Sequence, residues 1–210
     1  KINHFFISKY NECWIPDFTN NLISGELSKI DNKKKKFKFI GPLSRLEKRD
    51  LQVKYKYCFL ISGPEPQRTI LENIARRELE KIKEKSIIIL GKTEENKIEK
   101  YGTHTIYSHL KSEKLNKILL ESEIIISRSG YTTIMDLYKL EKKAILIPTP
   151  GQTEQQYLAK YLEEKSIFLS RIQENFCIAS AYLKSENFSG FNNNIKSEIK
   201  WKELFKIFEG

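Results

Sequence analysis

The chain has 210 residues, enough for one α/β domain with accessory segments, and its 37 Lys and Arg against 27 Asp and Glu give a formal net charge of +10. The three cysteines are far apart and form no CxxC pair, which argues against a disulfide framework and a zinc site and fits a reducing cytoplasm. No apolar run approaches the ~20 residues that cross a bilayer, so any membrane contact is expected to be peripheral.

The basic residues are spread through the sequence, and the one dense run is residues 33–36. We interpret them as a solvated Lys-rich surface and expect no nucleic-acid partner, since that run has only Phe37 and Phe39 as neighbouring aromatics. A basic face that rests on anionic lipid headgroups stays open.

Residues 1–40 stand outside the regular pattern that follows. The chain opens at Lys1 without an initiator Met, and we therefore expect a fragment of a longer protein. An apolar segment surrounds residues 13–16, residues 37–40 are strand-like, and residues 41–45 (Gly-Pro-Leu-Ser-Arg) are typical of a hinge.

Short apolar runs alternate with amphipathic stretches from residue 57 onward. The expected strands are residues 58–61, 86–90, 105–107, 123–127, 144–147 and 167–169, and the expected helices are residues 67–83, 112–120, 132–140, 153–164 and 174–183. Runs that are apolar on both faces and separated by helices predict a parallel sheet covered on both sides, a doubly wound α/β domain. A last amphipathic helix is expected over residues 198–208.

In such a sheet the ligand lies beyond the carboxyl ends of the strands. In the first loop there, Ser62 and Gly63 let the backbone approach a ligand, the following helix presents free N–H groups to a phosphate, and Arg68 can add a bidentate contact. An ordinary strand-to-helix turn explains the same residues, because Pro64 and Pro66 remove donors. Both interpretations stay open.

The second loop has the stronger pattern. Ser129 and Gly130 predict a tight turn, and Thr132 or Thr133 can cap the helix or donate a hydroxyl to a phosphate. Asp136 falls on the second helical turn, where a carboxylate can accept hydrogen bonds from the vicinal hydroxyls of a ribose. The alternative is an acid placed favourably near a helix start.

The third loop covers residues 148–156 and gathers polar side chains at a helix start. They are Gln152, Glu154, Gln155 and Gln156. Amides and a carboxylate both donate and accept, as a polyhydroxylated sugar requires. A plain capping box formed by Thr153 and Gln156 is the alternative.

Ser127-Arg128-Ser129-Gly130 with Thr133 and Asp136, followed by a strand and residues 148–156, resembles the C-terminal domain of family 28 glycosyltransferases. The resemblance spans about residues 40–170. It implies a Rossmann-like sheet forming the C-terminal half of a GT-B architecture. The implied domains are residues 1–40 as a remnant of an N-terminal acceptor domain, 41–50 as an interdomain hinge, 51–190 as the nucleotide-sugar-binding domain, and 191–210 as a linker and C-terminal helix.

The same resemblance implies roles for individual residues. Ser62 and Gly63 stand at the family's diphosphate loop and Arg68 at the basic residue after it, while Arg45 stands at a hinge arginine that approaches the donor phosphates. Ser129, Gly130 and Thr133 would line the diphosphate, Asp136 replaces the usual Glu at the ribose, His109 and Leu110 lie in the uracil loop, and Gln152, Glu154, Gln155 and Gln156 would face the sugar. The sequence departs from the family where Pro64, Glu65 and Pro66 replace expected donors.

The expected activity is transfer of a hexosyl or N-acetylhexosaminyl group from a UDP-sugar to a lipid-linked or cell-envelope acceptor, with inversion. No metal and no cofactor besides the donor are expected, because the four Asp residues include no Asp-x-Asp motif. The general base is expected in the N-terminal domain, and His4 is not assigned that role. The 210-residue chain is expected to bind UDP weakly and to turn over no donor.

Two other functions remain open. A UDP-sugar epimerase or hydrolase of the same fold needs acid and base groups near the sugar, for which Glu154 is the one candidate. A non-catalytic donor-binding subunit of a split glycosyltransferase would carry the same site. The oligomeric state is left open. The expected location is the cytoplasm, peripheral to the inner face of the membrane.

Overall fold

The computed structural model describes residues 10–30, 36–191, 199 and 201–206. The chain divides into two compact units, residues 1–43 with 194–210 and residues 44–193. His4, part of the Lys33–Lys36 run and part of the expected C-terminal helix lie outside the described residues. The assignment of residues 1–40 to an acceptor domain stays a prediction.

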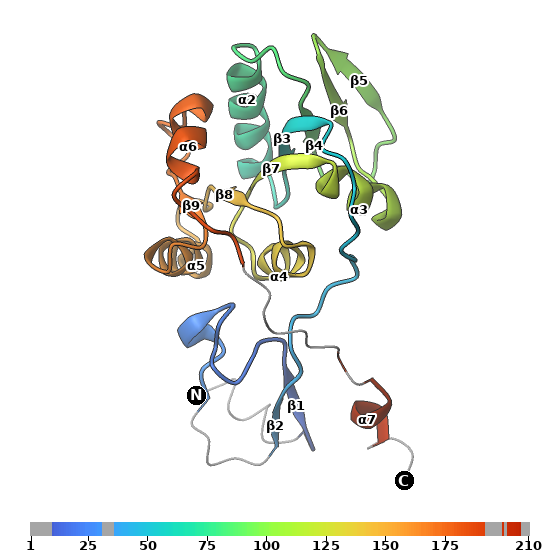
Figure 1. Cartoon of the computed structure of the whole chain (residues 1–210), viewed down its shortest axis with the longest axis vertical. Helices are drawn as coiled ribbons and strands as arrows, with labels where there is room; N and C mark the ends of the chain where they lie inside the picture. Colours follow the sequence, from blue (N-terminus) through green and yellow to red (C-terminus); the bar gives the residue numbers. More distant parts are fainter. Residues whose placement is uncertain (1–9, 31–35, 192–198, 200, 207–210) are drawn as a thin grey trace. The chain divides into compact units, whose positions relative to one another are not determined.

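The larger unit alternates strands and helices (Figure 1). Its elements are β3 (Tyr55–Leu60), α2 (Gln67–Leu79), β4 (Ile87–Ile89), β5 (Ile98–Tyr101), β6 (His104–Tyr107), α3 (Ser112–Leu120), β7 (Ser122–Ser127), α4 (Tyr131–Leu140), β8 (Ala144–Leu146), α5 (Thr153–Glu164), β9 (Leu169–Ser170) and α6 (Ile178–Ser185). The fold is therefore the expected α/β class.

The sheet of the larger unit has seven strands in the order β5-β6-β4-β3-β7-β8-β9. All neighbours pair in parallel except β5 and β6. Counted along the chain, the parallel strands follow the order 3-2-1-4-5-6 of a doubly wound nucleotide-binding fold. The order reverses between β3 and β7, which are hydrogen-bonded neighbours.

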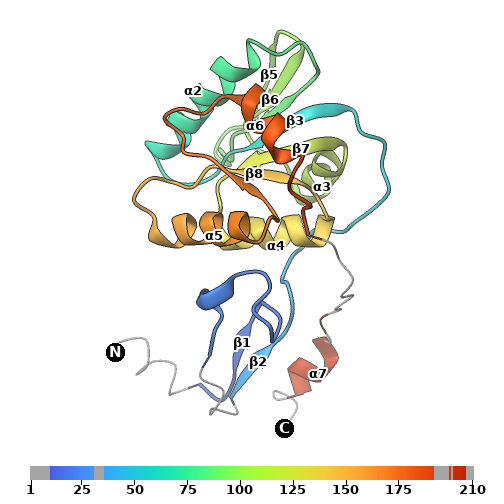
Figure 2. The same cartoon turned by 60° about the vertical axis from the view of Figure 1, so that its left-hand side comes forward.

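Both faces of the sheet are covered because successive strand residues point to opposite sides. Tyr57, Phe59 and Ile61 pack in one cluster with Leu71 of α2 and Ile178 of α6, while α4 and α5 cover the other face (Figure 2). Cys58 lies between Tyr57 and Phe59 in the strand, points to the other face of the sheet, and is also fully buried. Burial on both sides explains why these strands have continuous apolar sequences rather than alternating ones.

Some expected boundaries were wrong. The helix expected over residues 67–83 ends at Leu79, and the helix expected from residue 174 begins at Ile178. The second difference has a long-range cause, because the buried Glu78 carboxylate of α2 accepts the N–H of Ile178 (3.0 Å) and so fixes the first residue of α6.

Strand β5 was not predicted from the sequence. Residues 98–100 are exposed, so β5 lacks the apolar pattern from which the other strands were predicted. Tyr101 pairs with His104 across Gly102, whose positive φ of 58° suits a tight two-residue turn. That glycine was the available signal for a hairpin.

The smaller unit is built around a short parallel pair, β1 (Cys13–Ile15) with β2 (Phe37–Phe39), the 3-10 turn η1 (Gly25–Leu27) and the helix α7 (Trp201–Phe205). The fully buried Asp17 carboxylate accepts hydrogen bonds from Ile23 N–H (3.0 Å) and from the hydroxyls of Ser24 (2.6 Å) and Ser28 (2.7 Å). Phe205 of α7 packs edge-on against Trp14, with ring centroids 5.6 Å apart. The sequence had not identified this partner.

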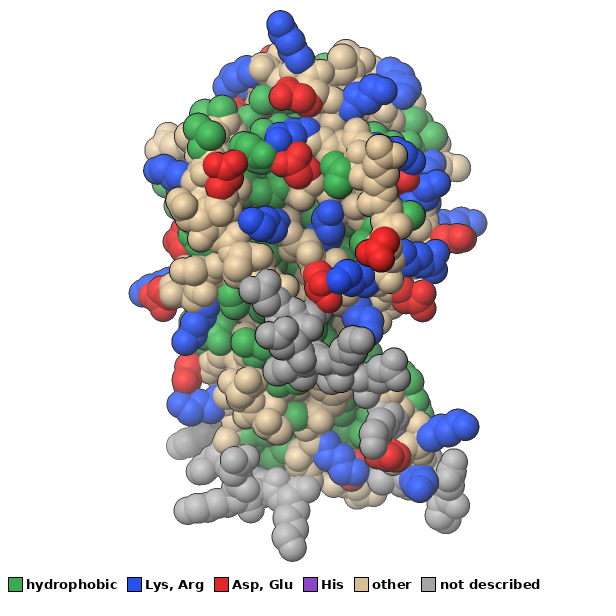
Figure 3. All heavy atoms as spheres, in the orientation of Figure 1, with side chains coloured by type: hydrophobic (Ala, Val, Ile, Leu, Met, Phe, Trp, Pro, Cys, Tyr) green, Lys and Arg blue, Asp and Glu red, His purple; other side chains and the backbone are tan. Residues whose placement is uncertain are grey.

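Basic and acidic side chains are interspersed over the face of the α/β unit in Figure 3. Many lysines and arginines are paired, as in the ion pair of Lys56 with Glu123 (2.9 Å) and that of Arg76 with Glu99 (2.8 Å). Such pairs are typical of the solvated charged surface that the composition indicates. Among the described residues no helix is long and apolar enough to cross a membrane.

Candidate functional site

Three loops meet at the carboxyl edge of the sheet, because β3, β7 and β8 are consecutive neighbours there. They follow β3 (residues 61–66), β7 (residues 128–130) and β8 (residues 147–152). α2 and α4 leave this edge on opposite faces of the sheet (Figure 2). Ligands of doubly wound folds bind at such a reversal point.

Arg128 ties the three loops together. Its side chain is fully buried, and its guanidinium donates to the carbonyl oxygens of Ile147 (3.1 Å), Pro148 (3.3 Å) and Gln67 (2.9 Å). Burial lowers the pKa of Arg128 to about 10, so the group stays protonated at neutral pH. The sequence analysis used Arg128 to recognise the motif but missed this function; a cationic residue directly after a buried strand was the signal.

Two of the predicted ligand residues, Ser129 and Gln155, also form hydrogen bonds that join these loops to one another and to α5. The Ser129 hydroxyl donates to the carbonyl of Gln155 (2.7 Å), which links the second loop to α5. The Gln155 side-chain oxygen accepts the Thr149 N–H (2.9 Å), and its amide donates to the Gln152 side chain (2.5 Å). These polar atoms are engaged within the chain, so the structure gives them a supporting position.

In the first loop, a carboxylate occupies the start of α2. Glu65 accepts the backbone N–H of Thr69 (3.1 Å) and the Arg68 guanidinium (2.8 Å). The hydrogen bond from Arg68 is the main reason that the pKa of Glu65 falls to about 2. Arg68, predicted to contact a phosphate, is thus already bound to a carboxylate, with Glu94 a further 3.7 Å neighbour. Ser62 and Gly63 lie exposed beside it.

The second loop leaves the start of α4 without such a carboxylate. Gly130 is the N-cap residue and has no side chain with which to cap this end. Thr132 and Thr133 lie in the first turn, because α4 begins at Tyr131, so neither is the cap that the sequence analysis allowed. A helix end of this kind favours an anion.

Asp136 lies on the second turn of α4 and contacts the hinge segment. Its carboxylate accepts the Ser44 hydroxyl (2.5 Å), and Arg45 is close enough to influence it. Burial raises the pKa of Asp136, while the Ser44 hydrogen bond and the Arg45 charge act in the opposite direction. The fold therefore brings Arg45 and Asp136 together, although 90 residues separate them in the sequence.

Residues 44–47, which fall in the predicted hinge, are held by buried contacts within the larger unit. Leu46 is fully buried, and its N–H donates to the Ser44 hydroxyl (3.0 Å). Asn116 of α3 forms two hydrogen bonds with the backbone of Glu47, of 2.9 and 3.0 Å. These contacts fix the backbone on either side of Arg45, whose side chain is exposed.

The predicted uracil loop follows β6, two strands from β3. Nδ1 of His109 is hydrogen-bonded to the carbonyl of Glu95 (2.5 Å), and the Ser108 hydroxyl donates to the same carbonyl (2.8 Å). Leu110 is half-buried beside them. The side chain of His109 thus shapes the loop. His104 lies in the core, where its Nε2 is hydrogen-bonded to the Leu79 carbonyl (3.0 Å).

The remaining sugar-facing candidates lie at the start of α5. Gln152, Glu154 and Gln156 are exposed. Gln152 is the N-cap residue and forms no side-chain cap bond, so the capping box suggested for Thr153 and Gln156 is wrong. Their contact with a sugar stays a prediction.

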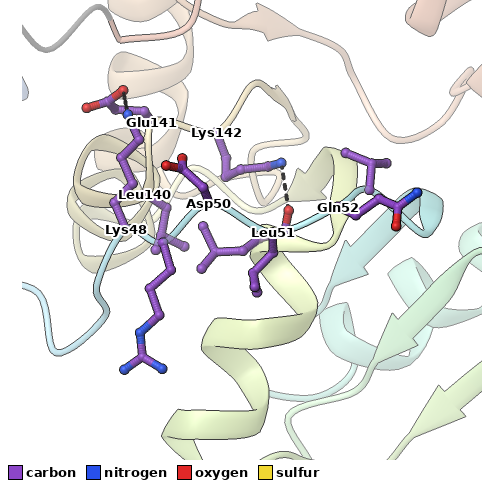
Figure 4. A pocket seen from close by; sticks show the side chains of 10 residues that line it. Lys48, Asp50, Leu51, Gln52, Leu140, Glu141 and Lys142 are labelled. Atoms are coloured by element: carbon purple, nitrogen blue, oxygen red, sulfur yellow. Dashed lines mark hydrogen bonds and ion pairs between the residues drawn. The ribbon is translucent and has the colours of Figure 1, made fainter.

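An open pocket of about 430 Å³ lies at the amino ends of the strands, at the end of the sheet opposite to the three loops (Figure 4). It is lined by Lys48, Arg49, Asp50, Leu51, Gln52, Val53, Leu120, Leu140, Glu141 and Lys142. None of these is a predicted donor residue, and the pocket lies near the amino ends of β3 and β7. Within the described chain no three His, Cys, Asp or Glu side chains are grouped to hold a metal ion.

The fold is that of one half of a GT-B glycosyltransferase. The glycosyltransferase of kitacinnamycin matches with a TM-score of 0.60 at 12% identity, over 83% of this chain and 46% of that chain. SnogD from Streptomyces nogalater matches with a TM-score of 0.51 at 10% identity, over 73% and 43%. The predicted fold class is confirmed.

Residues 60–176 match the model of the glycosyltransferase family 28 C-terminal domain, and the chain belongs to this family. It is 24% identical over 156 residues to the UDP-N-acetylglucosamine–N-acetylmuramyl-(pentapeptide) pyrophosphoryl-undecaprenol N-acetylglucosamine transferase of Sulfurihydrogenibium sp. (strain YO3AOP1). The match covers 73% of this chain and 44% of that protein. The resemblance noted from the loops is confirmed, and the chain spans less than half the length of this relative.

Proposed function

We propose that this chain is the donor-binding part of a UDP-sugar-dependent glycosyltransferase. The observation that carries the proposal is the reversal point of the sheet, where α4 starts at a glycine N-cap and carries Asp136 on its second turn. An anionic diphosphate suits the first feature, and a ribose suits the second. Membership of the glycosyltransferase family supports assigning both features to one nucleotide-sugar ligand.

In the proposed reaction an acceptor hydroxyl attacks the anomeric carbon of the sugar with inversion, and UDP leaves. Negative charge then grows on the phosphate oxygens. We propose that the start of α4 and the guanidinium of Arg45 stabilise that charge and so lower the barrier without a metal ion. The general base is proposed to come from outside the donor unit.

The relative's name supports a more specific proposal for the substrates. That protein uses UDP-N-acetylglucosamine and a pyrophosphoryl-undecaprenol acceptor. We therefore propose an N-acetylhexosaminyl or hexosyl donor and a lipid-linked acceptor, with the enzyme peripheral to the inner face of the membrane. Charged side chains on its surface would allow contact with anionic headgroups.

The test is a calorimetric titration of the folded chain with UDP, uridine, GDP and ADP. UDP is expected to bind weakly but more tightly than uridine, because the diphosphate adds contacts at α4. GDP and ADP are expected to bind less tightly than UDP, since a uracil site excludes purines. Absence of UDP binding while circular dichroism shows an intact fold would refute the proposal.

Product analysis with UDP-N-acetylglucosamine separates the remaining functions. The chain by itself is expected to release neither an epimerised sugar nor free UDP. Sugar epimerisation or donor hydrolysis by the chain would instead identify an epimerase or a hydrolase with Glu154 as the first candidate acid or base. Binding without turnover, restored to transfer by a second polypeptide, would identify a subunit of a split enzyme.

A further inference from the structure

Arg128 is a buried cation whose charge the described chain leaves unpaired. Its hydrogen-bond acceptors are three backbone carbonyls, and its Nε atom has no partner within the described residues. Five other arginines form ion pairs with carboxylates, and Arg45 is exposed to solvent. The nearest acidic influence on Arg128 is the exposed Glu174, which does not bond it.

The position of this charge matters because buried charges act over longer distances than exposed ones. Arg128 directly precedes the turn at Ser129 and Gly130, so it lies behind the start of α4. The carbonyls that it binds belong to the loop after β8 and to Gln67, the first residue of α2. Arg128 therefore ties the turn before α4 to the loop after β8 and to the start of α2, and it adds positive potential close to that turn.

We propose that Arg128 is a positioning residue for the donor diphosphate, which it orders by joining the three loops and attracts by its unpaired charge. This inference rests on the proposed function. Arg128 does not touch the donor in this view, because its terminal nitrogens are occupied by carbonyls. Its effect passes through the start of α4, whose N–H groups it aims at the phosphates.

The experiment compares UDP with uridine, which lacks the phosphates, by calorimetry on the full chain. The measured quantity is the ratio of the dissociation constant of uridine to that of UDP. Arg128→Met removes the charge and the hydrogen bonds of the guanidinium. It is expected to lower this ratio about tenfold, which is the size expected for one charge acting across a partly buried site. Arg128→Lys keeps a positive charge but loses the planar guanidinium, and it is expected to lower the ratio less.

The control is Arg49→Met, which removes one positive charge at the opposite edge of the sheet and is expected to leave the ratio unchanged. If Arg128→Met does not fold, Arg128→Lys decides alone, and a wild-type ratio in it contradicts the proposal.

The outcomes separate the inference from the function on which it rests. A wild-type chain that binds neither ligand refutes the donor-binding function and this inference with it. A wild-type chain that binds UDP, together with an Arg128→Met variant of unchanged ratio, leaves the function standing and overturns the inference. Equal losses of UDP and uridine affinity in the variant would show a purely structural role, which also overturns it.

Discussion

The loops after β3 and β7 have the same plan, a buried strand, a turn of small residues and a helix, yet their helix starts differ. At α2 the Glu65 carboxylate takes the Thr69 N–H and neutralises Arg68. At α4 the cap is Gly130, and the arginine behind it is bonded only to carbonyls. A helix start attracts an anion only where the chain does not supply its own. The difference between the two helix starts supports the proposal that a donor diphosphate binds at α4.

The largest expected effect concerns Asp136, which distinguishes α4 further. Asp136→Ala is expected to weaken UDP binding about 10- to 100-fold, because hydrogen bonds to a charged group are worth about 1.5–3 kcal/mol. The variant should also lose discrimination between UDP and 2′-deoxy-UDP, which calorimetry measures. The control is Asp50→Ala, at the opposite edge of the sheet. Undiminished UDP binding in Asp136→Ala would remove the ribose assignment.

The pH dependence of stability tests the environment of Asp136 independently of any ligand. Burial raises its pKa in the folded state, so its ionisation opposes folding as the pH rises above the unfolded value of about 3.9. Asp136→Asn keeps the shape and removes the charge. It is expected to be more stable than the wild type at neutral pH, with the difference vanishing below pH ~4 in denaturant titrations. A less stable Asn variant at neutral pH would contradict the assigned cause.

The two turn glycines provide the second prediction. Gly63 has a φ of 108°, where a side chain is strained, so Gly63→Ala is expected to cost about 1–3 kcal/mol of unfolding free energy. Gly130 has a φ of −70°, and a Cβ there would meet nothing closer than the Thr133 hydroxyl at 3.8 Å. Gly130→Ala should therefore cost less stability than Gly63→Ala, about 1 kcal/mol or less, because alanine is a poorer N-cap residue than glycine.

Gly130→Ala is nevertheless expected to weaken UDP binding several-fold, up to about tenfold, because the added methyl occupies space beside the proposed diphosphate. Thermal unfolding and UDP titration of both variants give the comparison. Wild-type UDP affinity in Gly130→Ala would mean that no phosphate approaches this turn, and the diphosphate would have to be sought elsewhere.

These differences also show how far the sequence could predict the molecule. The parallel sheet was predictable, because strands buried on both faces, such as residues 123–127, carry uninterrupted apolar runs. The strand, turn and helix around Asp136 were also predictable from local spacing, and their role as a nucleotide site stays a prediction. The contact of Asp136 with Ser44 was not, since it joins residues 92 positions apart. The bonds of Arg128 and the capping of α6 by Glu78 likewise depend on which loops the fold brings together.

The smallest expected effect concerns the start of α2, where the Glu65 carboxylate already accepts a backbone N–H. Glu65→Gln removes the carboxylate from the start of α2 and frees Arg68, so UDP affinity is expected to rise about threefold through the added positive potential. The matched control is Glu94→Gln, because Glu94 is also paired with Arg68, while the backbone N–H of Thr69 in α2 is bonded to Glu65. A weaker UDP affinity in Glu65→Gln would instead mean that the Glu65–Arg68 pair itself contributes to the donor site.

Stability measurements on the same variant follow from the low pKa of Glu65. Its value of about 2 in the folded state lies below the unfolded value of about 4.3, so the ionised carboxylate stabilises the fold above the unfolded pKa. The wild type should therefore be more stable than Glu65→Gln at neutral pH, and the difference should disappear as the pH falls from about 4 towards 2. A difference that persists at pH 2 would show that the charge of Glu65 is not its cause. In that case the contrast between α2 and α4 would rest on Gly130 and Arg128 alone.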